Sequence, residues 1–374
     1  MVRSIEALAE DVAPARGGMN ILFIGADTGT SKHRIDAIER CGHRVDVVNP
    51  LAMFGLNRVI QILIWRFGCR GLSILTHLYV RSKIGARSYD FCVVNHGETV
   101  WPLLVRFLKT RCGFVTCYNA DNPFVARDGA KWRIMLRALP EYDSFCTPRM
   151  SSVKRAYGLG AKHVIRYVQT ADEVVHQARP FDRKDSDLYR SEVALVSTWM
   201  PERGKFAARM IAAGVPLKIF GANWFKAPEY PEIADHIVLE TFLGDEAYVR
   251  AIQYTRIAIG LVSEGNEDEH THRSVEIPAL GALLCAKRTP QHVELYEDGV
   301  EAVLWDDVED CIAQCRGLLA EPERLAIIAK AGQAKAQRSG NWNEPLMRRV
   351  IAETVAAATR AKPDAAVAPE LMSQ

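Results

Sequence analysis

The sequence has 374 residues, of which 48% are hydrophobic and 25% are charged, and its formal net charge is +2 at pH 7. This length predicts two domains, the composition suits ordinary hydrophobic cores, and the near-neutral charge excludes a strongly basic surface for nucleic acid. Nine cysteines are spread along the chain without a C-x-x-C pair, and Cys311 and Cys315 lack histidine partners, so we expect reduced thiols in a cytoplasmic protein and no zinc site.

The chain begins with a predicted tail over residues 1–18, which is too acidic and too weakly apolar for a signal peptide. An apolar strand over 19–25, a helix over 31–41 and a strand over 45–48 follow, in the order of a right-handed βαβ unit. No stretch of the sequence has the length and apolarity of a transmembrane helix.

The loop after the first strand carries Gly25 and Asp27. It departs from G-x-G-x-x-G because Asp27 takes the place of the second glycine, and Lys32 does not follow Gly29 with the spacing of a P-loop. A dinucleotide or nucleoside triphosphate site is therefore not expected here. Both residues still follow the carboxyl end of a strand, where open α/β sheets bind ligands.

Residues 53–84 combine many apolar side chains with five basic ones: Arg58, Arg66, Arg70, Arg81 and Lys83. One interpretation is a pair of helices packed into the domain. The other is a peripheral membrane face near a lipid-linked or hydrophobic acceptor. Because Gly68 and Gly71 interrupt a single long amphipathic helix, we favour packed helices.

Polar residues follow the ends of later strands, which are predicted over 89–95, 114–118 and 142–147. His96 follows the first of these, and a structural role and an acid–base or acceptor role fit it equally well. Asp121 and Asn122 follow the second, where Asp and Asn before proline are also good turn residues. Arg149 follows the third.

A polar segment without strands predicts a linker over 176–190. It contains Asp185-Ser186-Asp187, formally a D-x-D motif of the kind that binds a metal diphosphate. In a charged linker we expect this pair to be solvated.

The second α/β unit is predicted from residue 191, with strands over 192–197, 217–220, 255–261 and 282–286. Thr198 opens the loop after the first of these strands, and Arg203 lies a few residues further on. Backbone N–H groups and this guanidinium could hold a diphosphate, although a solvated first helical turn explains Arg203 equally simply. Gly221 follows the next strand as a turn residue.

The stretch from Asp268 to Cys285 predicts a polar loop, a short helix and a glycine turn into a buried strand. Thr271 is the predicted N-cap, which would leave free backbone N–H groups beside Arg273 for a phosphate. Glu276 lies one turn further on, where its carboxylate could accept hydrogen bonds from ribose hydroxyls; the alternative is a plain i,i+3 ion pair with Arg273. Gly281 permits the tight turn.

The run Arg273-x-x-Glu276-Ile277-Pro278-Ala279-x-Gly281, followed by Glu301, resembles the CgeB-like (spore-maturation type) glycosyltransferases of the GT-B fold. Asp121-Asn122-Pro123 and Pro148-Arg149 fit the same family, and the resemblance extends from residue 19 to about residue 361. Asp268 and Glu276 have the spacing of the acidic pair in retaining GT-B enzymes, but the first position is Asp rather than the usual Glu. The role carried over is therefore that of Glu276.

This resemblance implies an α/β protein with two doubly wound Rossmann-like domains facing each other across a cleft. The acceptor-side domain would span residues 19–175 and the donor domain residues 191–341. A helix over 344–361 would pack back on the first domain, and a disordered tail would occupy 362–374.

The implied reaction moves a sugar from a nucleotide diphosphate sugar to an unknown acceptor, without metal or other cofactor. The implied donor-binding residues are Thr198, Arg203, Gly221, His272, Arg273, Glu276 and Gly281. Gly25, Asp27, Asn122 and Arg149 would lie on the acceptor side, and an inverting reaction would take its base from His96 or Asp121. A nucleotide-sugar epimerase and a non-catalytic assembly protein of the same fold are the alternatives. The expected location is cytoplasmic, with peripheral contact at the inner membrane face if residues 53–84 bind lipid.

Overall fold

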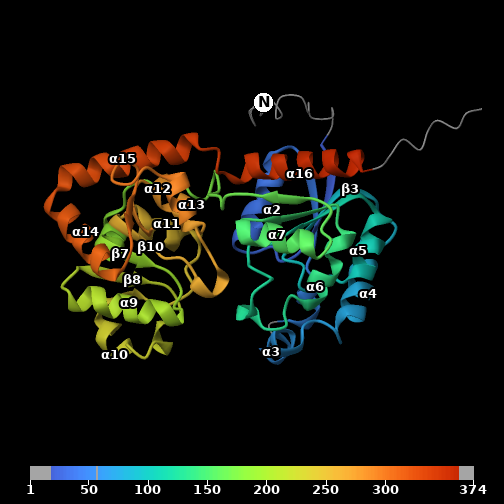
Figure 1. Ribbon diagram of the computed structural model, residues 1–374, viewed down its shortest axis with the longest axis horizontal. Helices are drawn as coiled ribbons and strands as arrows, with labels where there is room; N and C mark the ends of the chain where they lie inside the picture. Colours follow the sequence, from blue (N-terminus) through green and yellow to red (C-terminus); the bar gives the residue numbers. More distant parts are fainter. Residues whose placement is uncertain (1–17, 56–57, 362–374) are drawn as a thin grey trace, which may run out of the picture. The chain divides into compact units, whose positions relative to one another are not determined.

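The computed structural model describes residues 18–55 and 58–361. The chain divides into two compact units (Figure 1). Unit 1 contains the residues up to Tyr167 and those from Met347 onward, and unit 2 runs from Val168 to Leu346.

The described residues of unit 1 form one parallel sheet of six strands in the order β2-β1-β3-β4-β5-β6. The strands are β1 (Asn20–Ile24), β2 (Arg44–Val48), β3 (Tyr89–Asn95), β4 (Cys112–Tyr118), β5 (Ser144–Thr147) and β6 (Val164–Arg166). The helices are α2 (Thr30–Arg40), α3 (Arg58–Phe67), α4 (Ser73–Ile84), α5 (Pro102–Lys109), α6 (Arg133–Ala138) and α7 (Met150–Gly158), with short 3₁₀ turns η1 (Pro50–Phe54), η2 (Ala126–Asp128) and η3 (Leu139–Glu141). Helix α16 (Asn343–Arg360) completes the unit, and its Thr354 Oγ1 lies 2.7 Å from Ser144 Oγ in β5.

Unit 2 repeats this plan with the strand order β12-β11-β10-β7-β8-β9 in its described residues. The strands are β7 (Ser191–Val196), β8 (Leu217–Phe220), β9 (Ile237–Leu239), β10 (Thr255–Gly260), β11 (Leu283–Lys287) and β12 (Val303–Trp305). The helices are α8 (Arg183–Tyr189), α9 (Pro201–Ala212), α10 (Tyr230–Ile233), α11 (Asp245–Gln253), α12 (Arg273–Ala279), α13 (Pro290–Leu295), α14 (Val308–Ala320) and α15 (Pro322–Arg338), with 3₁₀ turns η4 (Trp224–Lys226), η5 (Ala234–His236) and η6 (Glu264–Asn266).

Alternate residues of one strand enter separate cores on the two faces of the unit 2 sheet. Val193 and Leu195 of β7 belong to one apolar cluster, and Ala194 and Val196 belong to another. A parallel sheet whose faces are both covered by helices requires such continuous apolar strands. Each unit is therefore doubly wound, as the sequence predicted.

Several elements differ from the sequence-based expectation. Residues 176–190, expected as a linker, lie in unit 2 and contain α8, which Asp182 caps through its side chain. Asp185 pairs with Arg250 at 2.9 Å, so it is engaged in an ion pair on α11 rather than solvated. The three-residue strands β6 and β9 were not predicted, because three residues show too little periodicity. The tails predicted over 1–18 and 362–374 lie almost wholly outside the described residues.

Residues 53–84 form the predicted pair of helices, α3 and α4, but the expectation that these helices are packed is only half right. Ile64 and Val80 are buried, yet Ile62, Trp65 and Leu78 are more than half exposed. The pattern misled because both helices carry apolar residues on the outer face as well as the inner one. None of the helices in the described residues is long and apolar enough to cross a bilayer.

Candidate functional site

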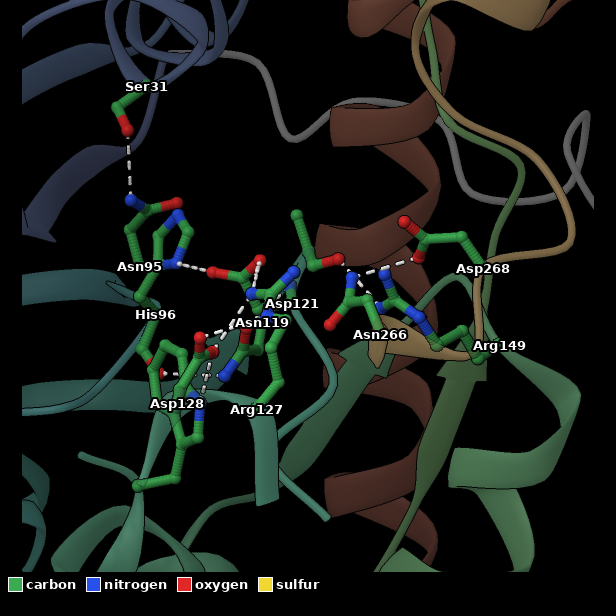
Figure 2. Close-up of polar contacts among 12 residues, drawn as sticks. Ser31, Asn95, His96, Asn119, Asp121, Arg127, Asp128, Arg149, Asn266 and Asp268 are labelled. Atoms are coloured by element: carbon green, nitrogen blue, oxygen red, sulfur yellow. Dashed lines mark hydrogen bonds and ion pairs between the residues drawn. The ribbon is translucent and has the colours of Figure 1, made fainter. Parts of the chain in front are cut away.

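Polar side chains gather at the carboxyl ends of the strands in each unit, the edge at which open α/β sheets bind ligands. In unit 1 the cluster contains His96, Asp121, Arg127 and Asp128 (Figure 2). In unit 2 it contains Glu276 with Arg203 and Arg273 nearby.

His96 stands directly after β3 in an uncommon backbone conformation. Its φ is 63°, in the left-handed region, and Gly97 continues with φ 81°. The His96 N–H donates to Tyr118 O at 2.7 Å, and the Asn119 amide donates to His96 O at 3.2 Å. A non-glycine residue held this way costs about 1–3 kcal/mol, and such residues cluster at functional sites. The imidazole stacks over Trp132, with ring centroids 6.2 Å apart.

Asp121 lies between His96 and Arg127. Its Oδ2 is 3.5 Å from His96 Nδ1, and its Oδ1 accepts from Arg127 Nη2 at 2.9 Å. Burial raises the pKa of Asp121, but the hydrogen bond from His96 and the charges of Lys131 and Arg127 outweigh burial and hold this pKa well below its usual value. The carboxylate stays ionised, so it is a weak base. It can instead hold a proton on His96 Nδ1, which would leave Nε2 as the basic nitrogen.

Arg127 and Asp128 support this pair and were not predicted. Arg127 Nε donates to Asp128 Oδ1 at 2.9 Å, and Asp128 Oδ2 accepts from Trp132 Nε1 at 2.9 Å. The two carboxylates raise the pKa of Arg127 despite its partial burial. An Arg-Asp dipeptide matches no sequence motif, so the sequence alone could not predict that these residues lie beside His96.

Arg34 on α2 is a second unpredicted residue at this edge. It is 1% exposed, and its Nη2 donates to Asn95 Oδ1 at 3.1 Å. Its guanidinium carbon lies 4.7 Å from the centre of the Tyr118 ring. Arg34 Nε is buried and has no hydrogen-bond partner among the described residues. Gly25 borders the group, because a side chain there would approach Asn95 Cβ to 3.0 Å.

The other predicted acceptor-side residues separate in the structure. Asp27 is exposed on the loop, where its charge helps to raise the pKa of Lys32. Asn122 is buried, and its Oδ1 accepts from Phe124 N at 3.2 Å, the turn role that the sequence also allowed. Arg149 is buried and donates to Ala120 O at 2.7 Å, so it supports the loop that carries Asp121.

Glu276 is the central charged group of the unit 2 cluster. It is 4% exposed; Tyr248 Oη donates to its Oε2, and its Oε1 lies 3.4 Å from His176 Nε2. His176 Nδ1 accepts from Asp172 N at 2.8 Å, which places the ring proton on Nε2, facing the carboxylate. Burial raises the pKa of Glu276, but the nearby histidines, the Tyr248 hydroxyl and Arg273 lower it below its usual value.

Two guanidinium groups of this unit, those of Arg203 and Arg273, are near enough for the charge of one to act on the other. Arg203 on α9 is 2% exposed and donates to Thr198 O at 2.7 Å, while its buried Nε has no hydrogen-bond partner in the described part of the chain. Burial and the charge of Arg273 lower the pKa of Arg203 to about 10, and the carboxylates of Glu202 and Asp268 offset only part of this shift. A buried, still charged guanidinium facing a second cation is costly unless an anion compensates it. The pair is therefore a candidate anion site.

Two predicted glycines have clear packing reasons. A side chain on Gly221 would collide with the carbonyl oxygen of Ser197 and lie 2.6 Å from its carbonyl carbon, so this glycine lets the turn after β8 approach the Thr198 loop. Gly281 follows α12 with φ 87°, and its N–H donates to Pro278 O at 2.9 Å. It ends the helix, as expected of a glycine in this conformation.

The start of α12 differs from the prediction. The N-cap is His272 rather than Thr271, and it makes no side-chain cap. Ser274 N–H donates to Thr271 O at 3.0 Å, so it is not free for a phosphate. His272 Nδ1 lies 2.9 Å from Thr170 O. In this cluster an anion would therefore receive hydrogen bonds mainly from guanidinium groups and less from backbone N–H groups.

Among the described residues, one group has the composition and proximity of a metal site. The sulfurs of Cys285, Cys311 and Cys315 lie within 4.8 Å of one another. All three belong to the apolar core between β11 and α14 and do not belong to the Glu276 cluster. They pack as core residues.

Comparison with known proteins shows the fold and one family match. Residues 203–349 match a family model described as glycosyl transferase-like. Sucrose-phosphate synthase from Thermosynechococcus elongatus superposes with a TM-score of 0.68 at 11% identity, covering 92% of this chain and 100% of that one. HepE from Anabaena, solved with UDP and glucose, gives 0.61 at 13% identity, covering 91% and 100%. A putative UDP-N-acetylglucosamine 2-epimerase from Listeria monocytogenes gives 0.55 at 11% identity, covering 93% and 98%. No curated protein matches the chain by sequence.

These structural matches extend over both six-stranded sheets, and the predicted GT-B fold of two Rossmann-like domains is confirmed. At these identities the likeness speaks for the fold, and the chemistry depends on the residues of this chain.

Proposed function

We propose that this chain is a glycosyltransferase of the CgeB-like type that moves a sugar from a nucleotide diphosphate sugar to an acceptor. The observation that carries the proposal is the unit 2 cluster, where a buried ionised carboxylate lies near two guanidinium groups, one of them 2% exposed. A nucleotide diphosphate needs both halves of this arrangement: hydrogen-bond acceptors for ribose hydroxyls and cations for the diphosphate. The glycosyl transferase-like match covers all three residues.

The donor would bind with its ribose on Glu276 and its diphosphate on Arg203 and Arg273. Tyr248 and His176 already hold the Glu276 carboxylate, and each leaves acceptor capacity on the oxygen it contacts. Negative charge builds on the diphosphate as the bond to the sugar breaks. Fixed guanidinium groups at this place would stabilise that charge without reorganisation.

In an inverting reaction the acceptor hydroxyl must lose a proton, and we assign this step to His96. Asp121, at 3.5 Å from Nδ1, would fix the ring and stabilise its protonated form. Arg127 keeps Asp121 ionised and so acts as a positioning residue. In a retaining reaction no such base is required, and His96 would contact the acceptor or the transferred sugar instead.

An epimerase is the second candidate, since the Listeria structure shares the fold. Its superposition is weaker than that of sucrose-phosphate synthase, and the family match is to glycosyl transferase-like sequences, so transfer is favoured. The two differ in their products: an epimerase converts a nucleotide sugar without acceptor, whereas a transferase releases the nucleoside diphosphate.

The direct test is a panel of nucleotide sugars, measured by thermal shift and by release of nucleoside diphosphate; UDP and UDP-sugars are the first probes, because the HepE structure holds UDP and glucose. A bound donor should raise the melting temperature, and the increase should grow with the logarithm of the donor concentration above its Kd. Slow hydrolysis of the same donor would support transfer. Stabilisation with epimer formation would favour the second candidate, and the absence of any stabilisation would favour a non-catalytic role.

A further inference from the structure

Two consecutive helices of unit 1 expose an unusual amount of apolar surface. Side chains that are 45% to 63% exposed come from both helices: Val59, Ile62, Leu63, Trp65, Phe67, Ile74, Leu75 and Leu78. Singly exposed apolar residues are normal, but exposed groups of this kind mark interaction surfaces. We call this set, with the basic residues between and after it, the α3–α4 surface.

The exposed residues share faces with basic side chains. On α3, Ile62 and Leu63 lie four and three residues before Arg66, so the three side chains share one side of the helix. The opposite side packs inward through Ile60 and Ile64, against Cys69 and Ile134. The helix is thus anchored by one face and presents the other.

The next helix repeats the arrangement. Ile74, Leu78 and Arg81 follow the i, i+4, i+7 spacing of one helix face and are all exposed. Thr76 and Val80 lie on the other face and are fully buried.

The charge of this segment has one sign. The sequence contains no Asp or Glu between Asp46 and Asp90, whereas it contains six basic residues there: Arg58, Arg66, Arg70, Arg81, Lys83 and Arg87. Arg87 pairs back to Asp46, and Arg66 lies over the Phe67 ring, 5.9 Å from its centre. Apolar side chains bordered by cations complement a bilayer with anionic headgroups. A second copy of the same face would instead bring like charges together.

The surface connects to the candidate site of unit 1. Helix α3 follows the carboxyl end of β2 in the chain, after the short turn η1. The Ala130 N–H donates to Trp65 O at 2.7 Å, and a side chain on Gly129 would lie 2.6 Å from the same oxygen. The loop that carries Asp128 is therefore held against α3.

We propose that the α3–α4 surface binds peripherally to a bilayer that contains anionic phospholipid, with apolar side chains in the acyl boundary and arginines at the headgroups. The inference goes beyond the proposed function and does not depend on it.

The test is cosedimentation of the full chain with vesicles of phosphatidylcholine alone or mixed with phosphatidylglycerol, at low and high salt. The wild type should bind the mixed vesicles roughly tenfold more tightly than the neutral ones, and salt should weaken the preference. Ile62→Glu combined with Leu63→Glu should reduce binding at least about tenfold, since charge enters the acyl boundary. Arg66→Glu with Arg81→Glu should abolish the preference for the anionic lipid.

The matched control is Ile327→Glu, because Ile327 is 69% exposed on α15 in unit 2. It should bind vesicles like the wild type, and all variants should keep the wild-type melting temperature and UDP affinity. The proposal would be overturned if the wild type sedimented with neither kind of vesicle. It would also be overturned if the Ile62/Leu63 variant bound the vesicles as tightly as the wild type. The proposal would also be overturned if the wild type formed a concentration-dependent oligomer without binding vesicles and the Ile62/Leu63 variant did not form that oligomer. If the wild type does not bind UDP, this result contradicts the proposed function and leaves the membrane proposal unaffected.

Discussion

His96 combines three features that seldom occur together without a function. It has a left-handed backbone, a carboxylate on Nδ1 and a side chain that is still 25% exposed. A structural histidine would gain nothing from the backbone strain. The arrangement favours an acid–base or sugar-contacting role over the purely structural one.

Replacement of His96 by alanine should lower kcat by roughly 10²–10⁴ if it is the base, with a smaller effect on donor affinity. The measurement is steady-state transfer to the acceptor identified from the panel, or donor hydrolysis to water. His163→Ala is the control, because this histidine lies in the same unit and is 30% exposed. Equal activity of the wild type and His96→Ala would remove His96 from the chemistry.

Asp121 makes a prediction about stability and pH. Its pKa is depressed in the folded state, so its ionised form stabilises the fold at pH values above the unfolded pKa of about 4, and this stabilisation is lost as pH falls through the folded value. Asp121→Asn should therefore lower the melting temperature at neutral pH, and its difference from the wild type should shrink below about pH 4. Melting curves at several pH values test this. A difference that does not change with pH would mean that the charge of Asp121 does not stabilise the fold.

Arg273 is expected to bind the diphosphate, and in the empty site it repels Arg203 but favours the ionised form of Glu276. Arg273→Ala should weaken UDP binding by about 1.5–3 kcal/mol, because it removes a charge-assisted hydrogen bond. It should relieve the repulsion of Arg203 and also remove a charge that helps to keep Glu276 ionised, so the melting temperature of the unliganded variant should change little. Calorimetry and thermal unfolding measure both, with Arg256→Ala, an arginine paired to Glu192 in the same unit, as control. Unchanged affinity in the folded variant would remove Arg273 from the site.

At the scale of elements, the sequence predicted the longer strands well. The bounds of β3 and β8 match the expected 89–95 and 217–220, because buried parallel strands are continuous apolar runs that end at polar residues. The short strands β6 and β9 and helix α8 were missed. The two strands have only three residues each, and helix α8 is mostly polar, so neither shows a clear hydrophobic period. Tertiary contacts rather than the local sequence pattern decide their secondary structure.

Gly221 is the element-scale test of how the Thr198 loop is positioned. Gly221→Ala should destabilise the protein by roughly 1–3 kcal/mol, because the new methyl group meets backbone atoms of Ser197 that cannot turn away. Gly317→Ala is the matched control: it lies within α14 in open space and should raise stability slightly. Urea unfolding midpoints compare the two. Equal midpoints would show that the turn adapts without cost.

At the scale of the molecule, the sequence predicted the GT-B fold but only part of each cluster. The residues that hold Glu276 come from two other places: Tyr248 on α11, and His176 from the segment expected to be a linker. Arg34 and Arg127 join the His96 edge in the same way. Such partners carry no local motif and become visible only when the sheet brings strand ends together.

The whole enzyme should work without a divalent ion. The fixed guanidinium pair of unit 2 would supply the positive charge that a metal supplies elsewhere. Turnover measured with EDTA should equal turnover with added magnesium or manganese. An absolute requirement for metal would contradict this and would call for a search for carboxylate ligands, beginning with Asp268.

Glu276 as a ligand of the donor ribose is the central feature of the proposed donor site, and one calorimetric cycle tests it directly. UDP and 2′-deoxy-UDP are titrated into the wild type and Glu276→Gln, with Tyr248→Phe as a control that loosens the carboxylate but keeps its charge. We predict that Glu276→Gln weakens UDP binding by roughly tenfold or more and that the ribo-over-deoxy preference of the wild type nearly disappears, because the two losses are not additive. If Glu276→Gln lowers only the melting temperature and keeps the full ribo-over-deoxy preference, Glu276 is a structural residue and the donor-site assignment is contradicted.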